Sequence, residues 1–126
     1  MTKKLTPVLF VEEIEPCLPF WVDRLRFDKR VEIPVGDALG FVILSKDDVE
    51  LMFQSRACVA ADVPALAGGP FAKDGVTLYL EVRDLAPVRE ATAGLEVVIP
   101  ERRTFYGATE IGVRAPGGIV VVFAAR

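Results

Sequence analysis

The stretch LTPVLFVEEIEPCLPFWVDRLRFD, residues 5–28, predicts a buried strand that leads directly into a helix. Leu5–Val11 is a short apolar run of the length typical of a strand. Glu12–Leu25 follows with three glutamates in its first turn, where the helix dipole favours acidic side chains, and with Pro16 where proline is tolerated. Its apolar residues recur at helical spacing and form one stripe, made of Ile14, Leu18, Trp21, Val22 and Leu25.

Three strands and a connecting segment follow this opening. Turn residues at Gly36-Asp37 and Lys46-Asp47-Asp48 separate the strands, which we expect over Lys29–Val35, Leu39–Ser45 and Val49–Gln54. Ser55–Asp74 differs in character, because it is rich in Ala, Pro and Gly. We interpret it as a connection that contains a short helix over Ala60–Ala67.

The second half of the chain repeats the same order of elements. A strand is expected over Val76–Val82, followed by an N-capped helix over Asp84–Ala93 that ends at Gly94. Three more strands complete the half, over Glu96–Pro100, Ala108–Arg114 and Ile119–Ala124.

Residue matches support an internal duplication as well as the order of elements. Leu9-Phe10-Val11 falls on Leu80-Glu81-Val82 at an offset of 71 residues (80 − 9), and Phe53 falls on Phe123 at an offset of 70 (123 − 53). One insertion or deletion explains the difference between the offsets. We therefore expect one α+β domain over 1–126 with two βαβββ modules, module one over 1–56, a linker over 57–75 and module two over 76–126.

The composition fits one ordinary domain and excludes several classes of protein. Of the 126 residues, 52% are hydrophobic and 26% charged, which argues against intrinsic disorder. The net charge of −3 argues against a nucleic-acid partner, which would call for a basic face. The chain contains no histidine, so Ser-His-Asp sites, Cys-His sites and His-ligated metals are excluded.

The cysteines and the apolar runs give the remaining general expectations. Cys17 and Cys58 follow no metal-ligand spacing, and we interpret them as reduced thiols that act as small apolar residues. Leu5–Val11 is too short for a signal peptide, and no run approaches the ~20 apolar residues of a membrane span. We expect a soluble, cytoplasmic protein.

With the repeat in place, the chain resembles the vicinal oxygen chelate superfamily, which includes glyoxalase I, extradiol dioxygenases and bleomycin-resistance proteins. In the opening stretch, Glu13, Phe20-Trp21 and Leu25-Arg26-Phe27 are similar to the family's first helix and following turn, with Arg26 replacing the usual glycine. Tyr106-Gly107 and Ala115-Pro116-Gly117-Gly118 are similar to its closing segment, with Ala115 replacing an aspartate. The resemblance is greatest to the bleomycin-resistance branch. It implies half-open curved sheets around a cavity, and a homodimer in which module one faces module two of the partner.

The resemblance also implies where a metal ion would be bound. Metal-dependent members supply ligands from the first and last strands of each module, at positions that correspond to Thr6, Thr77 and Val122 here. The fourth position is Met52 by the repeat offset, and a slip of two residues would select Glu50 instead. Threonine, valine and methionine do not make a site for a divalent cation. We therefore expect a metal-free protein without a cofactor.

Side chains two apart on a strand share a face, so the neighbours of these positions are expected to line the cavity. We expect a lining of aliphatic and aromatic groups with a few carboxylates. The candidate ligand-binding residues are Phe10, Glu50, Met52, Tyr79, Tyr106 and Glu110. No catalytic residue is assigned.

Three of the candidates also have a structural interpretation. Glu50 would be a solvated strand residue, and Glu110 would form a cross-strand pair with Arg102 or Arg103. Tyr106 would simply pack in its loop. Trp21, the one tryptophan, is interpreted as a core residue because it lies on the apolar stripe.

Two functions from different classes are consistent with these residues. The first is a metal-free protein that sequesters an amphipathic or cationic drug-like or natural-product ligand, as the resemblance implies. The alternative is a metal-independent lyase, isomerase or hydrolase that uses Glu50 or Glu110 as a general base. A third interpretation is a regulatory domain without a small-molecule site.

Overall fold

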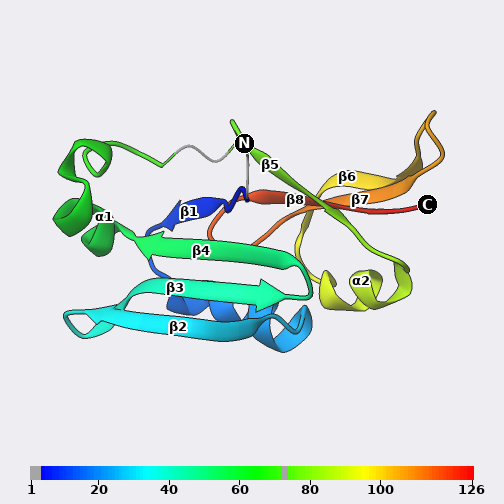
Figure 1. Cartoon of the computed structure of the whole chain (residues 1–126). Helices are drawn as coiled ribbons and strands as arrows, with labels where there is room; N and C mark the ends of the chain where they lie inside the picture. The colour runs from blue at the N-terminus through cyan, green and yellow to red at the C-terminus, as the bar shows by residue number, and fades with distance from the viewer. Residues whose placement is uncertain (1–3, 72–73) are drawn as a thin grey trace. The chain divides into compact units, whose positions relative to one another are not determined.

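In the computed structural model, which describes residues 4–71 and 74–126, each half of the chain forms a four-stranded sheet (Figure 1). The chain divides into unit 1, residues 1–71, and unit 2, residues 72–126. The strand order is β1-β4-β3-β2 in unit 1 and β5-β8-β7-β6 in unit 2. In each sheet the first two strands of this order run parallel and the other neighbours run antiparallel. The expected α+β class is confirmed, and neither sheet is closed.

The strands of unit 1 agree with the sequence prediction to within one to three residues at each end. Gly36 and Asp47 make the two hairpin turns with positive φ angles of 65° and 53°. Glycine suits such a turn, and aspartate is among the few other residues that tolerate it. The strands are β1 (Val8–Val11), β2 (Asp28–Val35), β3 (Ala38–Lys46) and β4 (Val49–Ser55).

The first helix is irregular, and the expected regular helix over Glu12–Leu25 is wrong. The segment instead forms a 3-10 turn, η1 (Glu15–Cys17), and a π-helix, η2 (Pro19–Arg24). Pro16 and Pro19 explain the difference, because neither has the backbone N–H that a continuous α-helix would use. The π winding closes each turn over five residues rather than four.

This wider winding changes which apolar side chains reach the core. Ile14, Trp21 and Leu25 are buried as expected, whereas Leu18 and Val22 are only half-buried. Two other side chains of the segment, those of Cys17 and Phe20, are buried in their place.

Aromatic side chains form the centre of the unit 1 core. The Trp21 ring makes edge-on contacts with Phe20, Phe27 and Phe53, at centroid distances of 5.3, 5.3 and 6.1 Å. Phe53 belongs to β4, so these contacts fix the helical segment to one face of the sheet. Edge-on ring pairs add to the stability that burial of their area supplies.

The connecting segment begins with a helix that starts earlier than expected. It forms α1 (Arg56–Asp62) and the 3-10 turn η3 (Pro64–Leu66), whereas the sequence predicted one helix over Ala60–Ala67. Ser55 explains the early start, because its hydroxyl accepts a hydrogen bond of 3.2 Å from the Cys58 N–H and caps the helix. Residues 72 and 73 of the expected connection lie outside the described residues.

Unit 2 has the same order of elements. Its helix starts two residues later than expected, because Asp84 makes an Asx turn, accepting a 3.0 Å hydrogen bond from the Ala86 N–H, instead of capping the helix. Its second strand, which was expected to end at Pro100, continues to Arg103 through a shift in register. The elements are β5 (Thr77–Glu81), α2 (Ala86–Ala91), β6 (Glu96–Arg103), β7 (Thr109–Arg114) and β8 (Val120–Ala125).

The two sheets have equivalent registers. Val8 pairs with Met52 in unit 1 as Tyr79 pairs with Val122 in unit 2. Val8 and Tyr79 are 71 residues apart, and Met52 and Val122 are 70 residues apart, which are the offsets read from the sequence. The structure therefore selects Met52, and not Glu50, as the counterpart of Val122. Among the described residues, no helix has the length and apolar character needed to cross a membrane.

Candidate functional site

Strand register places a row of charged residues across one face of the unit 2 sheet. Ala124 on β8 lies between Glu81 on β5 and Glu110 on β7, and Arg102 on β6 lies beyond Glu110. Residues two apart on a strand share a face, so Tyr79 projects from the same side as Glu81. Ala124 is short, which leaves room above it for longer side chains to meet.

Glu110 is the centre of a polar cluster on this face. Its side chain is 2% exposed, and both of its carboxylate oxygens are hydrogen-bonded. Oε2 accepts from the Tyr106 hydroxyl at 2.5 Å and from the Tyr79 hydroxyl at 2.8 Å. Oε1 accepts from Nη2 and Nε of Arg102 at 3.2 and 3.3 Å. A buried carboxylate needs such partners, and here four donors occupy its acceptor positions.

These contacts keep Glu110 ionised. The hydrogen bond from Tyr106, then that from Tyr79, and the pairing with Arg102 lower the pKa of Glu110 below its ordinary value, although burial acts in the opposite direction. Hydrogen bonds with Tyr106 and Glu110 raise the pKa of Tyr79. At neutral pH Glu110 is therefore a carboxylate that accepts hydrogen bonds from two tyrosine hydroxyls and a guanidinium.

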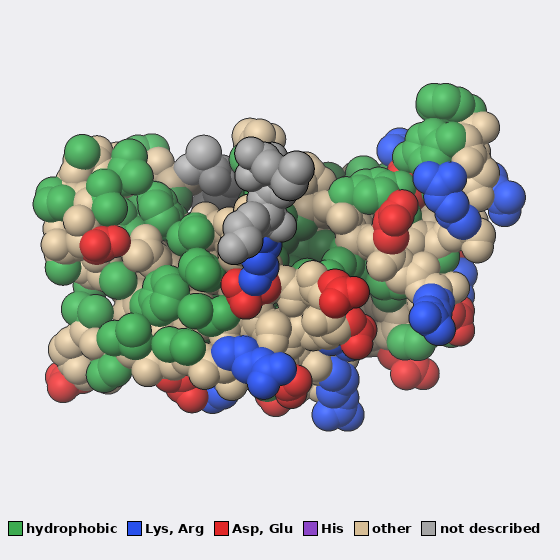
Figure 2. All heavy atoms as spheres, viewed as in Figure 1, with side chains coloured by type: hydrophobic (Ala, Val, Ile, Leu, Met, Phe, Trp, Pro, Cys, Tyr) green, Lys and Arg blue, Asp and Glu red, His purple; other side chains and the backbone are tan. Residues whose placement is uncertain are grey.

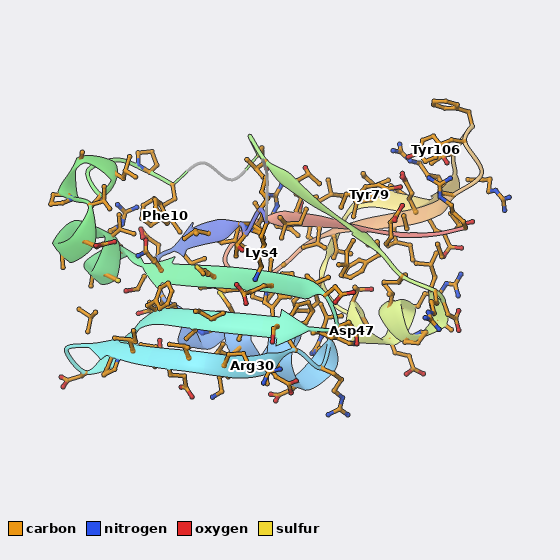
Figure 3. All side chains as sticks on the ribbon, in the orientation of Figure 1. Lys4, Phe10, Arg30, Asp47, Tyr79 and Tyr106 are labelled. Atoms are coloured by element: carbon orange, nitrogen blue, oxygen red, sulfur yellow. The ribbon has the colours of Figure 1, made fainter. Side chains whose placement is uncertain are left out.

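The cluster presents two aromatic rings to solvent (Figure 3). Tyr79 is 47% exposed and Tyr106 is 42% exposed, and their hydroxyl oxygens lie 3.5 Å apart. Because each phenol donates its proton to Glu110, its oxygen can still accept a hydrogen bond from another molecule. The arrangement therefore offers two ring faces and two acceptor oxygens in fixed positions.

The turn between β6 and β7 holds Tyr106 in place. The Thr104 N–H donates to the Ala108 carbonyl at 2.8 Å, and the Thr104 hydroxyl accepts from the Ala108 N–H at 3.0 Å. Gly107 completes the turn at a φ of 85°, a conformation that favours glycine. Phe105, which is fully exposed, packs edge-on against Tyr106.

The other three ligand-binding candidates, Phe10, Glu50 and Met52, belong to unit 1. Phe10 packs against Phe71 at a centroid distance of 5.5 Å, and Met52 is half-buried in β4. Glu50 forms an ion pair of 3.0 Å with Lys4, a partner that the sequence did not suggest.

The corresponding face of the unit 1 sheet is mostly apolar, although Glu50 and Gln54 also lie on it, and Figure 2 shows hydrophobic side chains gathered there. The row that contains Glu110 and Arg102 in unit 2 contains Phe41 and Ile33 in unit 1, and Val8 takes the place of Tyr79. Val8 and Ile33 are 45% and 49% exposed. The repeat therefore presents a mostly apolar version and a polar version of one sheet face.

The positions that the resemblance assigns to metal ligands do not suit a divalent cation. Thr77 is exposed at the start of β5, Val122 is buried and Thr6 precedes β1. Met52 offers only a thioether, and hard cations prefer oxygen ligands. Within residues 4–71 and 74–126, no three His, Cys, Asp or Glu side chains converge on a site that could hold a metal ion.

Sequence reasoning identified three of the four cluster residues as binding candidates. Tyr79, Tyr106 and Glu110 meet, and the fourth, Arg102, was expected only as a cross-strand partner of Glu110, a pairing that the structure contains. Sequence reasoning missed the contacts of Arg126, whose guanidinium lies 5.8 Å from the Tyr106 ring centroid and 4.0 Å from the Glu81 carboxylate. Alternation along β8 could have placed Arg126 on the same face as Val122 and Ala124, but it could not have placed Arg126 against the Tyr106 ring.

Comparison with solved structures identifies the fold. A glyoxalase/bleomycin resistance protein/dioxygenase from Nocardioides superposes with a TM-score of 0.74 at 20% identity, covering 99% of this chain and 84% of its own. A lactoylglutathione lyase from Agrobacterium tumefaciens gives 0.72 at 15% identity, with 99% and 94% covered. The bleomycin-binding protein of Streptomyces verticillus, solved with copper(II)-bleomycin, gives 0.61 at 25% identity, with 100% and 99% covered.

These similarities confirm, at the level of the fold, the resemblance to the vicinal oxygen chelate superfamily. No protein-family model matches the sequence, and no curated protein matches it either.

Proposed function

We propose, from the premise that this chain has the vicinal oxygen chelate fold, that it binds an amphipathic or cationic small molecule without a metal ion. The observation that carries the proposal is the pair of half-exposed tyrosine rings, Tyr79 and Tyr106, that the buried Glu110 carboxylate holds in place. We place the ligand on the face of the unit 2 sheet that carries these rings.

The chemistry of the cluster matches such a ligand. Exposed tyrosine rings bind flat apolar groups by stacking and attract cations through their π faces. The two phenol oxygens, whose protons point to Glu110, accept hydrogen bonds from N–H or O–H groups. Because the rings are already fixed, less side-chain freedom is lost on binding.

The solved structures supply precedents for both classes of function. The Streptomyces verticillus protein binds bleomycin, and the Agrobacterium tumefaciens protein is a lyase. The choice between binding and catalysis for this chain therefore depends on its own residues.

The paired carboxylates favour binding over general-base catalysis. A general base needs a free lone pair and a pKa close to the working pH. Glu110 accepts four hydrogen bonds and its pKa is lowered, and Glu50 is paired with Lys4. Both candidates for the base of the alternative enzyme are thus engaged by other residues.

A ligand screen tests the proposal. The probes are metal-free bleomycin, the fluorescent aromatic bis-amidine DAPI and the uncharged dye Nile red, each followed by thermal shift and fluorescence titration. A ligand at one hundred times its dissociation constant stabilises a protein by about 2.7 kcal/mol. We expect at least one probe to bind. Chemical conversion of a probe, detected by mass spectrometry, would instead favour the alternative that the protein is an enzyme.

Two variants locate the site. Tyr79→Leu removes one ring and should weaken binding by roughly two- to tenfold, the range of an aromatic pair. Val97→Ala is the matched control, because Val97 is also exposed but pairs with Val113, on the opposite face of the sheet from Glu110. Equal affinities for both variants would contradict the proposed location.

The homodimer and the cytoplasmic location remain predictions. Sedimentation over a range of dilutions tests the dimer, and a monomer at micromolar concentration would contradict it.

A further inference from the structure

Arg126 makes two contacts on the face of the unit 2 sheet that carries the cluster. Its guanidinium carbon lies 5.8 Å from the centroid of the Tyr106 ring, within the range of cation–π attraction. One of its nitrogens lies 4.0 Å from the Glu81 carboxylate. A cation therefore already lies between a ring and a carboxylate beside the cluster.

The repeat provides a second arginine at the equivalent position. Arg56 follows β4 at the offset of 70 residues that relates β4 to β8 (126 − 56). Its guanidinium also lies over a ring, that of Phe71, at 3.9 Å, and it also pairs with a carboxylate, that of Glu12, at 2.6 Å. It makes one more hydrogen bond, of 2.5 Å, to the Ala67 carbonyl.

The two arginines differ in how firmly they are held. The side chain of Arg56 is 32% exposed, and its donors bind both oxygens of Glu12 and a carbonyl. Arg126 and Glu81 are each 66% exposed, and both contacts of Arg126 are long. Exposed pairs of this kind contribute little to stability. Arg56 is thus part of the structure of unit 1, whereas another cation could displace Arg126.

We infer that the Tyr106 ring and the Glu81 carboxylate form a subsite for a guanidinium, amidinium or ammonium group of the ligand, and that Arg126 competes with that group. This inference rests on the proposed function, because it places the cationic end of the ligand beside the rings of Tyr79 and Tyr106. It favours ligands that join a flat aromatic part to a cationic group.

The geometry explains why the subsite takes a cation. Glu81 and Glu110 lie in one row, on either side of Ala124. Glu110 is already paired with Arg102, whereas the exposed Glu81 carboxylate makes, among the described residues, only the long ion pair with Arg126. The carboxylate of Glu81 is therefore the one in this row that remains accessible to a ligand.

Titration with DAPI, which carries amidinium groups on a flat aromatic frame, tests the inference. Removing the competitor in Arg126→Ala should tighten DAPI binding by about two- to fivefold, the range of an exposed ion pair. Arg103→Ala is the matched control, because it removes the same charge from an exposed arginine of unit 2 that has no ion pair within the described residues. Glu81→Gln should weaken DAPI binding, and Nile red should respond to none of the three variants.

The outcomes separate this inference from the proposed function. Equal DAPI affinities for Arg126→Ala and Arg103→Ala, with binding that still depends on Tyr79, would overturn the subsite alone. Binding of Nile red but not DAPI would also overturn it and leave a site for uncharged ligands. If neither wild type nor Arg126→Ala bound DAPI, Nile red or bleomycin, both the subsite and the proposed function would be overturned.

Discussion

The hydroxyl of Tyr106 donates a hydrogen bond of 2.5 Å to the buried carboxylate of Glu110, four residues further along the chain. This bond joins the tip of the β6–β7 hairpin to the face of the sheet. The position of an exposed aromatic ring therefore depends on the ionisation of a residue that is 2% exposed.

We expect the contribution of Glu110 to stability to disappear in acid. Its pKa is lowered in the folded chain from the ordinary value of 4.5, so its stabilising effect is fully present above about 4.5 and is lost as the pH falls through the lower, folded value. Glu110→Gln should melt at a lower temperature than wild type at pH 7, and the difference should shrink as the pH falls below 4.5. Thermal melts across this range measure it. Glu90→Gln, an exposed site on α2, serves as the control, and a difference that stays constant with pH would contradict the prediction.

The strands and the repeat could be predicted from the sequence because they depend on local patterns. Apolar runs bounded by Gly36, Asp47 and Gly117 give strand and turn positions without reference to the rest of the chain. The irregular winding of the first helix could not be predicted, because the spacing of apolar residues is the same whether or not Pro16 and Pro19 lack backbone N–H groups.

Gly112 should not tolerate a side chain. A Cβ at this position would lie 2.9 Å from both Cβ and Cγ1 of Ile99, and Cβ cannot move without the backbone. Gly112→Ala should therefore lower the free energy of unfolding by about 1–3 kcal/mol in chemical denaturation. Gly75→Ala, where a Cβ meets nothing within 4 Å, should have a much smaller effect.

Ile99→Gly, which removes both Cβ and Cγ1 of Ile99, provides the check on this explanation. If the clash with Ile99 is the cause, this substitution should destabilise Gly112→Ala less than it destabilises wild type. Additive effects of the two substitutions would show that the cause lies elsewhere.

The two equivalent arginines should differ in their importance for stability. Arg56→Ala loses the paired contacts with Glu12 and the stacking on Phe71, and should destabilise the chain by about 1–2 kcal/mol. Arg126→Ala should stay within about 0.5 kcal/mol of wild type, as surface substitutions usually do. Urea denaturation of both variants measures this, and a larger effect at Arg126 would reverse the assignment of roles.

The two cysteines should differ in reactivity. Burial raises the pKa of the Cys17 thiol to about 11, and its side chain is inaccessible, whereas Cys58 is half-exposed. The thiolate is the reactive form, so DTNB at pH 8 should modify one thiol of the native chain, and Cys58→Ser should abolish this reaction. Cys17→Ser should keep it, and two thiols should react after unfolding. Rapid modification of both in the native chain would contradict the burial of Cys17.

The candidate site was only partly accessible from the sequence. Tyr79 and Glu110 could be placed on one face by alternation, because a strand fixes the direction of every second side chain. The contact between Arg126 and Tyr106 could not, because it joins the residue after β8 to the tip of a hairpin whose shape depends on Thr104 and Gly107.

The matching registers of the two sheets let the chain serve as its own reference. Phe53 and Phe123, which occupy equivalent places, are both fully buried, and this agreement marks a position that both halves use for their cores. Phe41 and Glu110 are equivalent as well, yet one is apolar and the other carries a charge. Comparison of the two halves thus separates positions that both sheets use for packing from positions that only one sheet uses for polar chemistry, within a single polypeptide.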